Sequence, residues 1–164
     1  MIKILNVLNK QNIICAIIII LLFGIDRLSK IKILNNFSEN NSFYINDYLN
    51  IDLIWNTGIG FGLFNLNAGL IYHSVTIFIF LIILFILYLM VNSPNKEKLY
   101  YSTLVGGAFG NFYDRSTYFA VPDFIDLHIN NFHWFTFNIA DIFITIGVLL
   151  LIFNETLKKE NDKK

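Results

Sequence analysis

Two aspartates in the C-terminal half of this 164-residue chain have no positive charge near them in the sequence. Asp123 and Asp141 lie in a stretch, residues 116–157, that contains no lysine or arginine. Two carboxyl groups brought together in a low-dielectric site cannot both ionise easily, so they share one proton. One of them can then accept a proton from water while the other donates one to a leaving amine, which is the chemistry of an aspartic peptidase. Asn138 can hydrogen-bond the carboxylate of Asp141 if a helix has already begun there.

Other kinds of site have weaker support in the sequence. His128 and His133 are five residues apart and no third ligand is evident, so we predict no metal site there. The single cysteine, Cys15, excludes an intramolecular disulfide and a thiolate metal cluster. There is no nucleophile elbow, phosphate loop or dinucleotide fingerprint. Twelve basic and twelve acidic residues exclude a basic nucleic-acid-binding protein.

The composition predicts that lipid surrounds the elements that position these residues. Hydrophobic residues make up 55% of the chain and charged residues 15%, against about 25% charged in soluble domains. Stretches of about 20 apolar residues can span a bilayer, and four are predicted, at residues 13–34, 69–91, 99–115 and 135–153. We expect one integral membrane domain, 1–164, an all-α protein with four transmembrane helices. We interpret the first span as a retained anchor, because no small-x-small cleavage site follows Ile25.

The third span is expected to be the interior helix of the bundle. It carries Gly106, Gly107 and Gly110, and small residues allow helices to approach closely. The chain from residue 44 to 55 alternates apolar and polar residues, which predicts a small β-rich segment between the first two helices. The glycines that follow, Gly58, Gly60 and Gly62, suit either a surface that pairs with an extended peptide or a turn, and both readings stay open.

The positive charges predict the orientation of the chain. Lysines precede the first span, separate the second from the third, and follow the fourth, whereas residues 33–95 and 116–157 contain none. The positive-inside rule therefore places both termini in the cytoplasm, with segments 35–68 and 116–134 on the extracytoplasmic side. Asp26 and Lys30, one helical turn apart, can pair at the outer end of the first span. Charges at membrane depth are costly, so a cluster at one level indicates either a functional site or structural ion pairs.

Five short motifs occur in order along the chain: Asp26-Arg27-Leu28-Ser29-Lys30; Asn56-Thr57-Gly58 with Phe61; Gly106-Gly107-Ala108-Phe109-Gly110-Asn111-Phe112-Tyr113-Asp114-Arg115; Val121-Pro122-Asp123-Phe124; and Phe137-Asn138-Ile139-Ala140-Asp141. In these motifs the sequence resembles the lipoprotein signal peptidases, or signal peptidase II, a family of bacterial membrane aspartic peptidases.

The resemblance implies that Asp123 and Asp141 are the catalytic dyad, in agreement with the argument from charge. It implies that five residues bind substrate: Asn56, Gly58, Asn111, Arg115 and Asn138. It further implies that three polar residues hold the outer ends of the helices together: Asp26, Lys30 and Asp114.

The family removes signal peptides from prolipoproteins on the N-terminal side of a diacylglyceryl-modified cysteine. The resemblance therefore implies an enzyme of the bacterial cytoplasmic (inner) membrane whose active site faces the extracytoplasmic side. We expect no metal or other cofactor, diacylglyceryl-prolipoprotein and membrane lipid as partners, no nucleic acid, and a monomer. Two alternatives are a small transporter that uses the aspartates as proton carriers and a membrane scaffold without catalysis. A transporter would place its carboxylates near the bilayer midplane and often shows inverted repeats.

Overall fold

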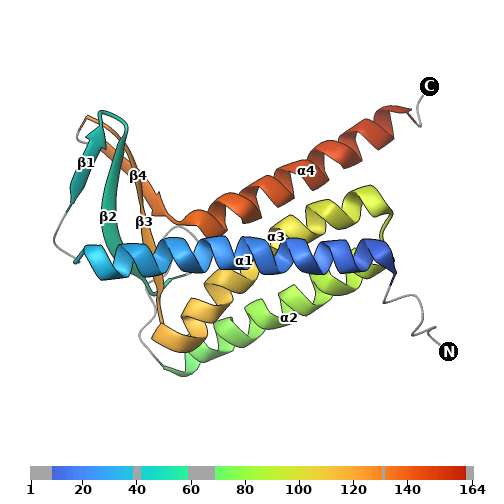
Figure 1. Ribbon diagram of the computed structural model, residues 1–164, viewed down its shortest axis with the longest axis horizontal. Coiled ribbons are helices and arrows are strands. Elements are labelled where there is room, and N and C mark those ends of the chain that lie inside the picture. The colour runs from blue at the N-terminus through green and yellow to red at the C-terminus, as the bar shows by residue number, and fades with distance from the viewer. Residues whose placement is uncertain (1–8, 39–41, 59–68, 131, 162–164) are drawn as a thin grey trace.

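The computed structural model describes residues 9–38, 42–58, 69–130 and 132–161. The elements follow one another as α1 (Lys10–Asn36), β1 (Phe43–Asn46), β2 (Leu49–Asn56), α2 (Leu70–Asn92), α3 (Asn95–Tyr118), β3 (Val121–Ile129), β4 (Phe132–Phe137) and α4 (Ile139–Asn161). The sheet lies at one end of the helices, and the start of α1 and the end of α4 lie at the other (Figure 1). The structure therefore confirms a mostly helical protein with a small β-rich part.

Three of the described helices, α1, α2 and α4, are long and apolar enough to cross a membrane. α1 begins earlier than predicted, at Lys10, because the side chain of Asn9 caps it by accepting a hydrogen bond from the backbone N–H of Asn12 at 2.8 Å. α3 is also longer than predicted, at 24 residues, but its first turn contains charged residues and it is not among the three apolar helices.

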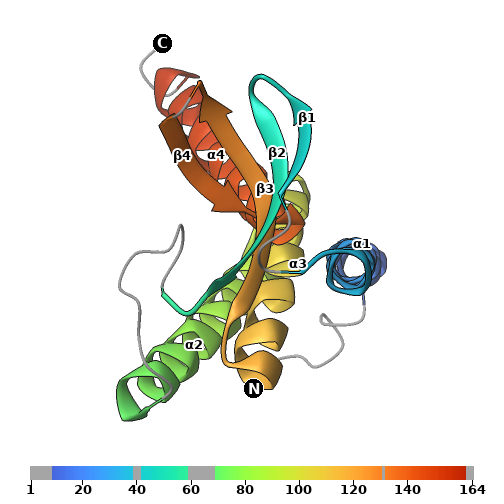
Figure 2. The ribbon, with the colours of Figure 1, turned by 90° about the vertical axis from the view of Figure 1, so that its left-hand side faces the viewer.

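α3 packs against each of the other helices and lies between them when the molecule is viewed from the sheet end (Figure 2). Its glycines make these contacts possible. A Cβ atom on Gly107 would collide with the backbone of Ala140 in α4, and one on Gly110 would collide with the carboxylate of Asp26 in α1. The structure thus confirms the prediction that α3 is the interior helix.

The sheet has four antiparallel strands in the order β1-β2-β3-β4. The sequence prediction found only the first two, which lie between α1 and α2. β3 and β4 come from the second connection, so the β-rich part is contributed by both connections and not by one. β3 is an inner strand, paired with β2 on one side and β4 on the other.

The predicted start of the fourth span, residue 135, is wrong. Residues 135–137 belong to strand β4, and the helix α4 begins at Ile139. The sequence Phe132-His133-Trp134-Phe135-Thr136-Phe137 is rich in aromatic residues, which favour strands, and it pairs with β3. Apolar length alone did not distinguish this strand from the first turns of a membrane helix.

A small apolar core fastens the sheet to the helices. Ile33 of α1, Leu53 of β2 and Phe124 of β3 are buried together, and Phe37 and Ile139 pack against them. Because Phe124 follows Asp123 and Ile139 follows Asn138, this core fixes the position of the polar residues beside it.

Candidate active site

A cavity of about 240 Å³ opens where the sheet meets the helices α2, α3 and α4. Its polar lining consists of Asn56, Asn111, Arg115, Asp123, Asp141 and Thr145. The apolar lining is Ile79, Ala108, Val121 and Ile144. The structure therefore brings both predicted catalytic residues, and three of the five predicted substrate-binding residues, to the wall of one cavity.

Two side-chain amides hold the carboxylate of Asp123. It lies on the inner strand β3, opposite Ile54 of β2, and is 3% exposed. Asn56, at the end of β2, donates from Nδ2 to Asp123 Oδ2 at 2.9 Å, and Asn138, just before α4, donates from Nδ2 to Asp123 Oδ1 at 2.6 Å. Each carboxylate oxygen of Asp123 therefore has an uncharged donor.

Asp141 occupies the first turn of α4, where it forms a reciprocal cap with Asn138. The backbone N–H of Asp141 donates to Asn138 Oδ1, and the backbone N–H of Asn138 donates to Asp141 Oδ2, both at 3.1 Å. Asn111 of α3 donates from Nδ2 to the other carboxylate oxygen of Asp141, Oδ1, at 2.7 Å. Asn138 thus contacts both carboxylates: its backbone N–H donates to that of Asp141, and its side-chain amide donates to that of Asp123.

Neither aspartate takes part in an ion pair among the residues that the structure describes. Burial is the main cause that raises the pKa of Asp123 to about 7, and the negative charge of Asp141 contributes to the same rise. The amide hydrogen bonds from Asn56 and Asn138 act in the opposite direction. Near neutral pH the pair can therefore hold one proton, as general acid–base chemistry at a dyad requires.

Arg115 contributes a buried positive charge to the wall of the same cavity. Its Nη2 donates to the backbone oxygen of Gly58, and the hydroxyl of Tyr72 donates to the backbone oxygen of Arg115 at 3.3 Å. Its other terminal nitrogen, Nη1, is buried and has no hydrogen-bond partner in the part of the chain that the structure describes. Gly58 does not line the cavity, but it is held in place by Arg115 and by Asn56, whose Oδ1 accepts from its backbone N–H at 2.9 Å.

The three predicted structural residues form an ion cluster behind the cavity. Lys30 is completely buried and donates from Nζ to Asp26 Oδ2 at 2.9 Å and to Asp114 Oδ2 at 2.7 Å. Arg27 forms a further ion pair with Asp114 at 2.5 Å. The predicted pairing of Asp26 with Lys30 one turn later is confirmed, and Asp114 ties α3 to the same lysine.

This ion cluster is joined to the candidate site by two hydrogen bonds. Lys30 Nζ donates to Asn111 Oδ1 at 3.0 Å, and Asn111 in turn donates to Asp141. The backbone N–H of Ala140, beside Asp141, donates to Asp26 Oδ1 at 3.0 Å. Asn111 therefore has its carbonyl and its amino group engaged by protein side chains, an arrangement that spacing along the sequence does not reveal.

Part of one predicted motif lies outside the described residues, namely Gly60, Phe61 and Gly62. The start of α4 at Ile139 was missed, although the sequence carries a signal for it. The pattern Asn138-Ile139-Ala140-Asp141 places a capping residue three positions before an acidic one, which is typical of the start of a helix.

A family model described as "Signal peptidase (SPase) II" matches residues 18–157 of the chain. A protein named lipoprotein signal peptidase from Pelagibacter ubique (strain HTCC1062) is 49% identical over 165 residues, covering 97% of this chain and 99% of that protein. One of the same name from Anaplasma marginale (strain Florida) is 35% identical over 150 residues, covering 90% and 87%. A solved structure described as a bacterial membrane enzyme matches with a TM-score of 0.75 and 30% identity, over 92% of this chain and 91% of that one.

Proposed function

Because this chain belongs to the signal peptidase II family of aspartic peptidases, we propose that it cleaves prolipoproteins with Asp123 and Asp141 as its catalytic dyad. The bond cut lies on the N-terminal side of a diacylglyceryl-modified cysteine. The observation that carries this assignment is the pair of aspartates lining one cavity, held by amides and by no cation among the described residues. Two carboxylates in that setting share a proton.

The reaction uses the dyad as acid and base. The ionised carboxylate takes a proton from water as the water oxygen attacks the carbonyl carbon of the scissile peptide. The protonated carboxyl group then gives its proton to the leaving nitrogen as the carbon–nitrogen bond breaks. Asn138 donates hydrogen bonds to both carboxylates and so fixes their positions relative to each other. Its role in this scheme is therefore to position the dyad.

Substrate binding is assigned to the polar groups around the dyad. Arg115 is buried at the cavity wall and its Nη1 has no partner within the described ranges, so it can donate to a carbonyl oxygen of the peptide or to a lipid headgroup oxygen. Asn56 lines the cavity, and hydrogen bonds with Asn56 and Arg115 hold the backbone of Gly58 next to it. The amide of Asn111 is engaged by Lys30 and Asp141, which favours a positioning role over direct substrate contact.

We also propose that α3 is a fourth membrane-spanning helix. Its 24 residues correspond to about 36 Å, enough for a hydrocarbon core of about 30 Å. It lies among three apolar helices that can shield its polar residues from lipid (Figure 2). Two antiparallel pairs of spans then place the sheet on one side of the bilayer and both termini on the other.

The orientation proposed is cytoplasmic for the termini and extracytoplasmic for the sheet and dyad, in the bacterial cytoplasmic membrane. The helix ends opposite the sheet carry lysines, as the positive-inside rule requires for the cytoplasmic side (Figure 1). These lysines are Lys10, Lys96, Lys98 and Lys158. Asp141 lies in the first turn of α4, at the sheet end. A transporter would use carboxylates near the middle of its helices, so nothing here favours that alternative.

The test is a gel-shift cleavage assay in detergent with a diacylglyceryl-modified prolipoprotein. Asp123→Asn and Asp141→Asn should each lower the cleavage rate by roughly 10²–10⁴-fold, because each removes one half of the acid–base pair. Asp52→Asn, on strand β2 and outside the cavity lining, is the matched control and should cleave at the wild-type rate. Continued cleavage by either dyad variant would overturn the assignment.

A further inference from the structure

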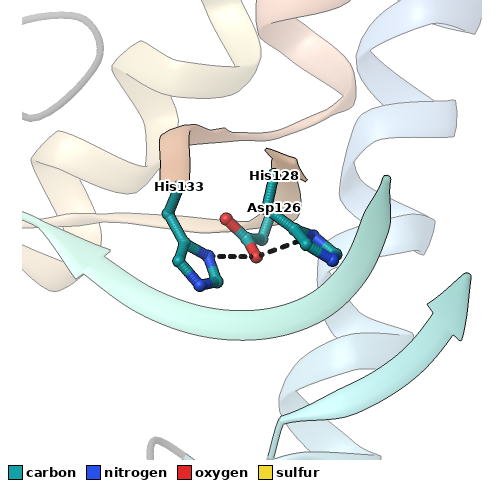
Figure 3. Close-up of side chains that lie close together, drawn as sticks. All are labelled: Asp126, His128 and His133. Carbon is teal, nitrogen blue, oxygen red and sulfur yellow. Dashed lines mark hydrogen bonds and ion pairs between the residues drawn. The ribbon is translucent and has the colours of Figure 1, made fainter. Parts of the chain in front are cut away.

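Two histidines and one aspartate converge on the β3–β4 hairpin, away from the dyad residues. His128 and His133 are directly opposed across the two strands, and their rings stack with centroids 5.3 Å apart. Figure 3 shows the two imidazole rings on either side of the Asp126 carboxylate, with an Nδ1 atom of each ring directed at the same oxygen. The sequence spacing of five gave two candidate ligands, and the hairpin supplies the third, Asp126.

The separations of the ligand atoms match the size of a small transition-metal ion. Asp126 Oδ2 is 2.8 Å from His133 Nδ1 and 3.6 Å from His128 Nδ1, and one ligand atom from each residue lies within 4.8 Å of the others. Zinc binds imidazole nitrogen and carboxylate oxygen at about 2.0–2.2 Å, so tetrahedral ligand atoms lie roughly 3.3 Å apart. Small shifts of these side chains would therefore enclose the ion.

A buried and unpartnered atom points independently to a missing ligand. His128 is only 8% exposed, and its Nδ1 atom is buried without a hydrogen-bond partner among the residues that the structure describes. Its separation from Asp126, 3.6 Å, is too long for a hydrogen bond. A buried polar nitrogen without a partner is costly, and a metal ion bound between it and Asp126 would satisfy it.

The surroundings of Asp126 support a metal ligand more than an ordinary surface carboxylate. Asp126 is 2% exposed, and Asn50 Nδ2 lies 3.4 Å from its Oδ2, so a second side chain orients it. His133 is 57% exposed at its side chain, which leaves a route for an ion and an open position for water. Two neutral imidazoles and one carboxylate are a ligand set that zinc accepts with water in the fourth position.

We propose that Asp126, His128 and His133 form a binding site for Zn²⁺ or a divalent ion of similar preference. The ion joins β3 to β4 at the hairpin end of the sheet. β3 also carries Asp123, and β4 leads directly to Asn138, so the bound ion stiffens the two strands that position the dyad. The site itself takes no part in the hydrolytic step.

Isothermal titration of Zn²⁺ into the full-length protein in detergent tests this site. The protein is purified without a polyhistidine tag and stripped with a chelator. We expect one zinc ion per chain, and at least tenfold weaker binding by His133→Ala, which removes the most exposed of the three ligands. His73→Ala is the matched control, because His73 is exposed on α2 and is not in the group; it should bind as the wild type does.

Two further readouts do not depend on any variant folding. Zinc X-ray absorption of the wild-type complex should show about two imidazole ligands, and zinc should raise the wild-type melting temperature because it binds only the folded hairpin. No saturable binding, a spectrum without imidazole, or equal affinities for His133→Ala and His73→Ala would each overturn the proposal. Binding is measured without substrate, so a chain that binds zinc and fails to cleave would refute only the proposed function.

Discussion

The ion cluster and the dyad are two sets of aspartates at the same end of the helices, and they differ in what surrounds them. In the ion cluster, Asp26 and Asp114 share the ammonium group of Lys30, and Arg27 adds a second cation. In the dyad, Asp123 and Asp141 receive hydrogen bonds only from amide groups among the described residues.

The difference separates a structural use of buried carboxylates from a chemical one. A cation beside a carboxylate favours its ionised form and opposes the effect of burial. Amide donors orient a carboxylate without cancelling its charge, so burial and the neighbouring aspartate still raise the pKa of Asp123 to about 7. Asn111 joins the two sets and transmits the position of the ion cluster to the dyad.

Replacing the lysine of the ion cluster should have the largest effect on stability. Lys30→Met leaves two buried aspartates without their shared cation, and breaking such a network costs about 3–5 kcal/mol. The melting temperature in detergent should fall sharply. Lys32→Met, two residues further along α1 at an exposed position, is the control and should melt near the wild-type temperature. Similar melting of both variants would mean that the ion cluster does not hold the helices together.

The dyad should make stability depend on pH in the opposite way from an ion pair. The native pKa of Asp123 is about 7, against 3.8 for an unperturbed aspartate, so between these pH values the folded protein keeps a proton that the unfolded chain has lost. Stability should therefore fall as pH rises from about 4 to 7, by about 4 kcal/mol for a shift of this size. Thermal unfolding of wild type and Asp123→Asn across this range measures it, and the decline should be smaller in the variant. An equal decline in both would contradict the raised pKa.

The amide of Asn56 should have a smaller and more specific effect. Cleavage by the wild type should decline above about pH 7 as the shared proton is lost. Asn56→Ala removes a donor that favours the ionised form of Asp123. The decline in rate above pH 7, which is the alkaline limb of the pH–rate profile, should therefore move to higher pH.

Asn50→Ala, on the same strand but beside Asp126, is the control and should keep the wild-type limb. A limb that moves to lower pH in Asn56→Ala would show that the amide acts on Asp123 in some other way. The measurement is the initial cleavage rate across the pH range at saturating substrate.

Much of this arrangement could be predicted from the sequence, because charge placement and helical spacing are local properties. The absence of cations near Asp123 and Asp141 indicated the dyad, and the spacing of Asp26 and Lys30 indicated their pairing. The glycines of α3 indicated a helix in close contact with its neighbours, and Gly107 and Gly110 do lie against α4 and α1.

The remaining features depend on contacts between distant segments. Strand β3 forms between β2 and β4, partners that lie on opposite sides of it in the sequence, so β3 and β4 were missed and α4 was predicted to begin too early. Asn111 could not be placed between Lys30 and Asp141 without the packing of three helices. In the same way, Asp126 joins His128 and His133 only through the register of the hairpin.

The most direct test of the comparison measures stability and cleavage together in isosteric variants of both sets. Asp123→Asn, Asp141→Asn and Asp114→Asn each replace one carboxylate by an amide of nearly the same shape. The two dyad variants should melt at or above the wild-type temperature and lose cleavage, whereas Asp114→Asn should melt lower and retain cleavage per folded molecule. Cleavage by either folded dyad variant, or loss of cleavage by Asp114→Asn while it remains folded, would contradict this account.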